Sequence, residues 1–146
     1  MNGLEFENKV EELLIKHNIV YKREGEKINY GHRASKGKYD FELKHHAIEC
    51  KSIMNLGSLS IPGINPKTHK PYASTKIHTH QIRALRAFKG VGWLLIHESN
   101  SNGFYALTMD DFDRFLVQND MPRSLKGINV DYSIDLERFI TSLKEE

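Results

Sequence analysis

Residues 38–52 read KYDFELKHHAIECKS and hold two short runs in which apolar and polar side chains alternate. Such alternation is typical of β-strands with one buried face, so residues 39–43 and 47–52 predict a hairpin. The expected core face consists of Tyr39, Phe41, Leu43, Ile48 and Cys50. The opposite face then presents four ionisable side chains, which are Asp40, Glu42, Glu49 and Lys51. We expect the apolar face to hold the hairpin against the core while the ionisable face is presented to a ligand.

The segment before the hairpin predicts a helix and a short strand. Residues 4–17 carry an apolar stripe at helical spacing, formed by Phe6, Val10, Leu13 and Leu14. Of the four glutamates in this helix, Glu7 lies nearest the stripe, and the others, Glu5, Glu11 and Glu12, are expected to point to water. Residues 19–23 predict a strand, and residues 24–38 predict a polar, basic loop.

The segment after the hairpin predicts a long loop and then a helix. Residues 53–77 are rich in proline, glycine and basic side chains, and a loop of this length inside a compact domain is more often functional or mobile than idle. Thr79 is expected to cap a helix over residues 80–89. In that helix the apolar spacing turns Gln81 inward.

The rest of the chain adds two strands and two helices. Residues 93–97 predict a buried strand because they form an almost wholly apolar run, and residues 104–107 predict a second strand. Thr108 and Asp135 are expected to cap the last two helices. The order of elements therefore predicts an α/β fold, in which a mixed central β-sheet is flanked by helices.

Length and composition limit the class of protein. The chain has 146 residues, which is the size of one ordinary domain, so we expect a single domain over residues 1–146. It contains no apolar run of about 18 residues and no signal-peptide pattern, and we therefore expect a cytoplasmic protein without a membrane partner. The single cysteine, Cys50, cannot form a disulfide within the chain or a thiolate zinc cluster.

Charge is distributed unevenly along the chain, although the net charge is only +2. Lys and Arg outnumber Asp and Glu in residues 13–90, and the reverse holds in residues 91–146. A basic face on an acidic body favours contact with nucleic acid, whereas the alternative is that these side chains are simply solvated. The candidate DNA-binding residues are Arg33, Lys36, Lys38, Lys67, Lys70, Lys76, His80 and Arg83.

The ionisable side chains of the hairpin suggest a metal-dependent nuclease centre. Asp40 and Glu49 supply the hard oxygen ligands that Mg²⁺ prefers, and they leave most coordination positions to water and phosphate oxygens. Lys51 lies two residues after Glu49, so it shares that face and can hold the attacking water or the scissile phosphate. Further candidate ligands are Glu7, directly or through water, and the backbone carbonyl of Cys50. The alternative is a hairpin whose outer face is merely charged and wet.

Several motifs, in the same order along the chain, carry a resemblance to a known family. They are GLEFE at residues 3–7, IECK at 48–51, IHTHQIR at 77–83, GVGWLLI at 90–96 and, more loosely, residues 123–128. With Asp40 between the first two, the sequence resembles the PD-(D/E)XK nuclease superfamily, which has the restriction-endonuclease-like fold. Within that superfamily it is similar to the RecU-type Holliday junction resolvases.

The resemblance implies a homodimeric endonuclease, dependent on Mg²⁺ with Mn²⁺ as a substitute, that acts in DNA recombination and repair. Such an enzyme makes paired nicks across a four-way (Holliday) junction, and its two-fold symmetry supplies two active sites in matching orientation. The resemblance makes Asp40, Glu49 and Lys51 the catalytic positions, supported by Glu7 and Gln81.

Two departures from the family concern junction selectivity. Family members carry a long basic stalk between the first strands, whereas here only residues 24–38 occupy that place. The approach to Asp40 also lacks the family's usual threonine, and the distance to Glu49 is shorter. We expect residues 53–77 to take over part of the role of the stalk.

Two other functions fit the same residues. One is a nuclease for another branched or nicked DNA, which competition between a four-way junction and duplex would separate from a resolvase. The other is a non-catalytic DNA-binding module of recombination. A decayed enzyme of that kind would be expected to have lost Asp40, Glu49 or Lys51, and all three are present.

Overall fold

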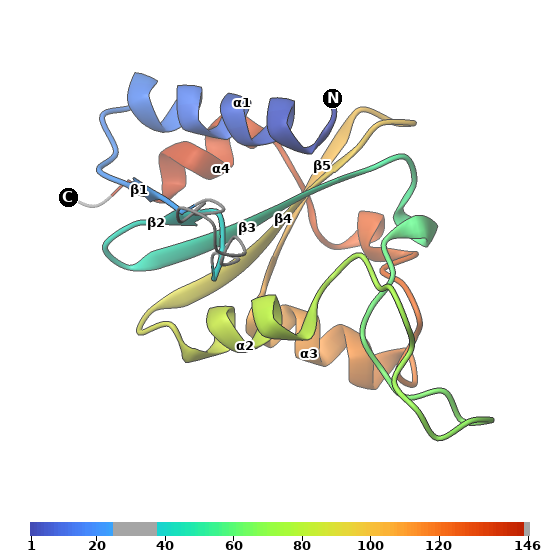
Figure 1. Cartoon of the computed structure of the whole chain (residues 1–146). Coiled ribbons are helices and arrows are strands. Elements are labelled where there is room, and N and C mark those ends of the chain that lie inside the picture. The colour runs from blue at the N-terminus through green and yellow to red at the C-terminus, as the bar shows by residue number, and fades with distance from the viewer. Residues whose placement is uncertain (25–37, 145–146) are drawn as a thin grey trace, which may run out of the picture.

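The computed structural model describes residues 1–24 and 38–144 of the chain. Within these residues, six strands form one sheet in the order in which they occur in the sequence (Figure 1). The strands are β1 (Lys22–Arg23), β2 (Phe41–Glu42), β3 (His46–Ile53), β4 (Val91–Glu98), β5 (Gly103–Thr108) and β6 (Ser133–Ile134). The last of these, β6, is a short edge strand that the sequence pattern did not predict.

The sheet is mixed because one of its pairs is parallel. β3 and β4 run parallel with Ile48 opposite Trp93, and every other neighbouring pair among the described strands is antiparallel. A parallel pair needs a crossover connection, which here contains residues 54–90. The crossover includes a helix, so the chain has the expected α/β fold with a mixed central sheet and flanking helices.

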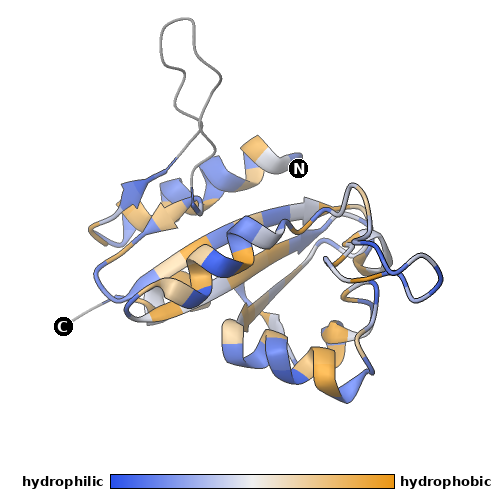
Figure 2. Ribbon diagram, turned by 60° about the horizontal axis from the view of Figure 1, so that its bottom comes forward, coloured by the Kyte–Doolittle hydropathy of each residue, from blue (hydrophilic) through white to orange (hydrophobic). Residues whose placement is uncertain are grey.

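Helices cover both faces of the sheet. α1 (Gly3–Lys16) and α4 (Leu136–Ser142) lie on one face, and α2 (Thr79–Ala87) and α3 (Met109–Gln118) lie on the other (Figure 1). Hydrophilic and hydrophobic residues are interleaved along each helix (Figure 2), and the residues that each helix buries are apolar. No helix in the described part of the chain is long and apolar enough to cross a membrane.

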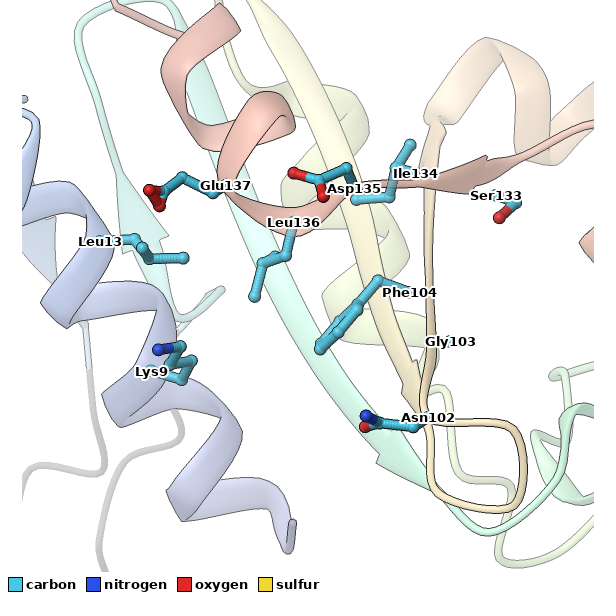
Figure 3. A pocket seen from close by; sticks show the side chains of 10 residues that line it. All are labelled: Lys9, Leu13, Asn102, Gly103, Phe104, Ser133, Ile134, Asp135, Leu136 and Glu137. Atoms are coloured by element: carbon cyan, nitrogen blue, oxygen red, sulfur yellow. The ribbon is translucent and has the colours of Figure 1, made fainter.

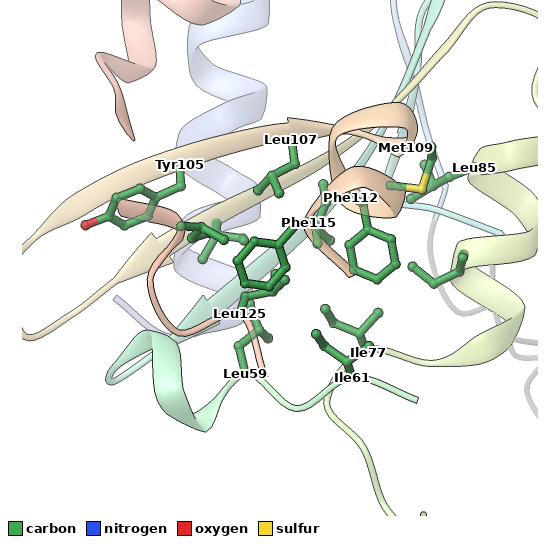
Figure 4. Close-up of a cluster of buried hydrophobic side chains, with 14 of the residues drawn as sticks. Leu59, Ile61, Ile77, Leu85, Tyr105, Leu107, Met109, Phe112, Phe115 and Leu125 are labelled. Atoms are coloured by element: carbon green, nitrogen blue, oxygen red, sulfur yellow. The ribbon is translucent and has the colours of Figure 1, made fainter. Parts of the chain in front are cut away.

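The core is divided by the sheet into two clusters. The α1-side cluster is centred on Phe6, Val10, Phe41, Ile48 and Leu95, all of which are fully buried. The α2-side cluster lies beneath α2 and α3 and includes Leu85, Leu107, Phe112 and Leu125 (Figure 4). Strand β3 is therefore covered on both faces, which a one-sided hairpin would not be.

Polar residues at the helix starts explain where the helices begin. The predicted caps Thr108 and Asp135 are confirmed, because each accepts a hydrogen bond from the backbone amide three residues later, at 3.0 and 2.9 Å. The predicted cap Thr79 is wrong, since α2 starts at Thr79 and His78 is its N-cap. Gln81 accounts for the shift, because its Oε1 accepts a hydrogen bond from the His78 amide at 3.0 Å.

The predicted hairpin is present, but Tyr39 lies on the unexpected face. In the antiparallel pairing of β2 with β3, Phe41 is opposite Ile48. The amide of the preceding residue, Asp40, nevertheless donates a hydrogen bond to the Ile48 carbonyl at 3.0 Å, so two residues of one strand are opposite a single residue of the other. Such a one-residue offset is the mark of a β-bulge, and it changes which side of the sheet the preceding residue faces. Tyr39 consequently belongs to the α2-side cluster, where its ring meets Phe88 edge to face.

Residues 53–77 are more structured than a plain loop. A 3-10 turn spans Leu56–Ser58, and isolated bridges join Ser60 to Ser124 and Ile64 to Pro71. Leu59 and Ile61 are buried in the α2-side cluster (Figure 4). The base of the segment is therefore part of the core, and residues 64–71 form a projecting tip (Figure 1).

Candidate active site

Asp40 is fixed at the point where three strands meet. Its amide donates to the Ile48 carbonyl of β3, and its carbonyl accepts from the Glu24 amide, which follows β1, at 2.7 Å. Its carboxylate Oδ2 accepts a hydrogen bond from the Cys50 amide at 2.7 Å. Because backbone and side chain are both held, the carboxylate has a defined position beside β3.

Glu49 is a buried acid in the middle of β3. The residue is only 4% exposed, so the alternative of a merely charged and wet outer face does not hold for Glu49. The face is closed by α2, whose Gln81 donates from Nε2 to Glu49 Oε2 at 3.0 Å, which confirms that Gln81 faces inward. Lys51 Nζ lies 3.5 Å from the same oxygen. Asp40 and Glu49, called the carboxylate pair below, are thus flanked by one lysine and one amide.

Burial and mutual repulsion dominate the electrostatics of the carboxylate pair. Burial raises the pKa of Asp40 to about 6, partly opposed by the Cys50 hydrogen bond. Burial and then the charge of Asp40 raise the pKa of Glu49 to about 8, although Lys51 opposes the shift. The protein therefore supplies too little positive charge to keep both acids ionised at neutral pH.

Glu7 approaches the carboxylate pair from α1. Its side chain is 25% exposed, and its Oε1 lies 3.5 Å from Arg23 Nη2. The charge of Glu7 raises the pKa of both Asp40 and Glu49, so the three acids are close enough to interact. This is consistent with the predicted inward position of Glu7.

Two other expectations about individual residues need comment. Glu11 was expected to point to water, which is wrong, because it accepts hydrogen bonds from Tyr21 at 2.9 Å and Arg23 at 3.2 Å. Cys50 is buried as expected, and burial raises the pKa of its thiol. Its amide takes part in the site through Asp40, while the role of its carbonyl as a metal ligand stays a prediction.

The donor set of the site suits a cation that takes few protein ligands. Within the described residues, no group of three or more His, Cys, Asp and Glu side chains is arranged to hold a metal ion. Mg²⁺ is commonly bound through one or two carboxylates, with waters and substrate phosphates as the other ligands. The carboxylate pair, with its hard oxygen donors and uncompensated negative charge, fits that requirement.

The predicted DNA-binding residues are exposed where the structure describes them, but they are spread over several elements. Lys67 and Lys70 are on the tip at residues 64–71, and the other exposed candidates are Lys38, Lys76, His80 and Arg83. Arg33 and Lys36 lie outside the described residues. Nothing in these positions tests the predicted contact with DNA.

Arg23 is the residue of this region that the sequence pattern did not single out. It lies on β1 and contacts both glutamates that α1 turns toward the sheet. A signal was present, because Tyr21 and Arg23 are two apart in a predicted strand and therefore share a face. That face meets α1, whose position could not be inferred from strand spacing.

A pocket elsewhere on the protein shares no residue with the carboxylate site. It has a volume of about 490 Å³ and lies between α1, the start of β5 and the start of α4 (Figure 3). It is lined by the apolar side chains of Leu13, Phe104 and Leu136 and by the charged side chains of Lys9, Asp135 and Glu137. A lining of mixed charge selects no particular class of ligand, so we assign the pocket no role.

Comparisons with known proteins leave the family open. No protein-family model matches the chain, and no curated protein matches its sequence. The resemblance to RecU-type resolvases therefore rests on the sequence motifs alone.

Proposed function

We propose that the protein is a Mg²⁺-dependent endonuclease that resolves four-way DNA junctions by paired phosphodiester hydrolysis. The observation that carries the proposal is the buried Glu49 beside the partly buried Asp40, with Lys51 3.5 Å from Glu49. An acid buried beside a second, partly buried acid destabilises a fold, and groups with strongly shifted pKa values cluster at functional sites. Folding alone gives no reason for the arrangement.

The residues of the site have separable roles in phosphodiester hydrolysis. When bound, Mg²⁺ would lower the pKa of a water and neutralise charge on the scissile phosphate. Asp40 and Glu49 would hold it. Lys51 would stabilise the negative charge that develops on the phosphate, or orient the attacking water. Gln81 keeps Glu49 in place through its amide hydrogen bond.

The choice of a branched DNA substrate has a different basis. It derives from the resemblance to RecU-type resolvases and from exposed basic side chains such as Lys67, Lys70 and Arg83. Resolution also needs two symmetric cuts, so we propose that a homodimer acts on the junction, with DNA recombination and repair as its setting. Mn²⁺ is expected to replace Mg²⁺, because both accept carboxylate and water oxygens.

A cleavage assay tests the proposal directly. A four-way junction, a flap and a duplex of matched sequence are incubated with Mg²⁺ or EDTA and with the wild type or Asp40→Asn. We expect symmetric nicks confined to the junction, which disappear with EDTA and with the substitution. Cleavage of the flap or duplex at equal rates would overturn junction specificity, and tight binding without cleavage by the wild type would identify a non-catalytic module.

A further inference from the structure

Arg23 joins the first helix to the edge of the carboxylate site. Its Nη1 donates to Asn8 Oδ1 at 2.9 Å and to Glu11 Oε1 at 3.2 Å, and its Nη2 lies 3.5 Å from Glu7 Oε1. The guanidinium also lies over the Phe41 ring, 5.6 Å from the centroid. The side chain is only 26% exposed, so these contacts restrict it to one place between β1 and α1.

The backbone of the same strand is attached to the carboxylate pair. The amide of Glu24, the residue after Arg23, donates to the Asp40 carbonyl at 2.7 Å, and Arg23 itself pairs with Phe41 in register. Arg23 is therefore tied to Asp40 by the backbone and to Glu7 by its side chain. A shift of Arg23 would move both acids relative to each other.

The contact with Glu7 is looser than the others. A charge-assisted hydrogen bond is usually 2.7–2.9 Å long, so the 3.5 Å separation is an ion pair without a close hydrogen bond. Asn8 and Glu11 fix the guanidinium, and the guanidinium then restrains the Glu7 carboxylate by charge. Without that charge, Glu7 would be a third uncompensated acid at a site that already holds two.

We propose that Arg23 is a positioning residue of the carboxylate site. Arg23 restrains the Glu7 side chain and cancels its charge, and in this way it sets the affinity of Asp40 and Glu49 for the divalent cation. The inference rests on the proposed function, because it presumes that a cation binds there. Arg23 acts through Glu7, because the side-chain contacts described above involve neither Asp40 nor Glu49.

Binding of Mn²⁺ to the DNA-free protein, measured by electron paramagnetic resonance, tests this without any need for activity. We expect Arg23→Gln to tighten Mn²⁺ binding by about tenfold, because the Glu7 carboxylate loses its ion-pair partner and its full negative charge then acts on the cation. In a Glu7→Gln background the same substitution should change the affinity by less than about twofold, since no charge remains for Arg23 to cancel.

Matched variants separate this role from a structural one. Lys22→Gln removes a positive charge from the adjacent, outward position of β1, where Lys22 pairs with Glu24, and should leave Mn²⁺ affinity unchanged. Arg23→Lys keeps the charge and should stay close to the wild type even if Arg23→Gln fails to fold. Thermal unfolding by circular dichroism reports the stability of each variant.

The outcomes distinguish failure of the inference from failure of the proposed function. If Mn²⁺ binds and Asp40→Asn abolishes the binding, but Arg23→Gln has no effect or has the same effect with and without Glu7, the role of Arg23 is overturned and the cation site stands. If Mn²⁺ does not bind the wild type, or binds Asp40→Asn equally well, the cation site and the role of Arg23 are both overturned.

Discussion

Glu49 is buried in a position where its negative charge is only partly compensated. It is 4% exposed, it lies near a second carboxyl, and Lys51 and Gln81 compensate only part of its charge. Its pKa of about 8 means that the folded protein keeps a proton that the unfolded chain loses near pH 4.5. Unfolding therefore releases a proton between these pH values, and stability must fall as pH rises through that window.

Glu49→Gln should consequently stabilise the metal-free protein at pH 8 and have little effect at pH 5. We expect a gain on the order of 2 kcal/mol in the free energy of unfolding at pH 8, measured by urea denaturation in EDTA. The exposed Glu12→Gln on α1 is the control and should change stability by less than about 0.5 kcal/mol at either pH. A wild-type stability that is equal at pH 5 and pH 8 would contradict the pKa of Glu49.

Alternation in the sequence placed Glu49 on the correct strand and beside the correct partner but did not show that its face is buried. Period-two spacing tells which side chains share a face, and it does pair Glu49 with Lys51. It contains no information on whether a helix from another part of the chain closes that face. Here α2 closes it, and only the parallel pairing of β3 and β4 brings α2 there. Strand spacing likewise cannot show that α1 covers the face of β1 that carries Arg23, which is why the sequence did not indicate a role for this residue.

At the scale of elements, Gln81 connects the start of α2 to the centre of β3. Its Oε1 accepts the His78 amide at the helix start, and its Nε2 donates to Glu49. One side chain thus caps a helix and restrains a catalytic candidate. The helical spacing of apolar residues predicted that Gln81 points inward. Its capping role was not predicted, because it depends on His78, and not Thr79, being the N-cap residue.

Two substitutions separate these roles of Gln81. Gln81→Ala removes both hydrogen bonds and should cost about 1 kcal/mol of stability or more at pH 5 and at pH 8 alike. Gln81→Glu keeps an acceptor for the His78 amide but places a third carboxyl against Glu49, so it should be close to the wild type at pH 5 and clearly less stable at pH 8. Urea denaturation at the two pH values measures both, and an equal loss for Gln81→Glu at each pH would show that Glu49 does not sense the new charge.

The tip at residues 64–71 allows the predicted DNA contact to be tested apart from the active site. The Ile64 to Pro71 bridge closes the tip, and Lys67 and Lys70 are exposed on it. A double change of Lys67→Gln and Lys70→Gln should lower junction affinity and reduce the slope of log affinity against log salt by about 2. Mn²⁺ binding should be unaffected. Changing the exposed Lys126 and Lys144 to Gln is the charge-matched control, and an unchanged affinity of the tip variant would exclude the tip from the DNA interface.

At the scale of the whole molecule, the site depends on residues far apart in sequence. α1 contributes Glu7, the β1 to β3 edge contributes Asp40 and Glu49, and the crossover to β4 returns Gln81. The sequence predicted the helices and the strands other than β6, because apolar periodicity and most caps are local signals. The bulge at Asp40 and the burial of Glu49 were not predictable, since both arise from pairing and covering that no local pattern encodes.

The symmetry of the proposed junction substrate leads to a prediction about assembly. A four-way junction is resolved by two cuts, and each protomer offers one carboxylate pair, so a resolving complex should contain two protomers per junction. Analytical ultracentrifugation with labelled junction should give that ratio. If wild type and Asp40→Asn are co-purified as mixed dimers through different affinity tags, each mixed dimer should bind the junction as tightly as the wild type but nick only one strand. Two nicks from a mixed dimer, or resolution by one protomer per junction, would mean that a single carboxylate pair makes both cuts.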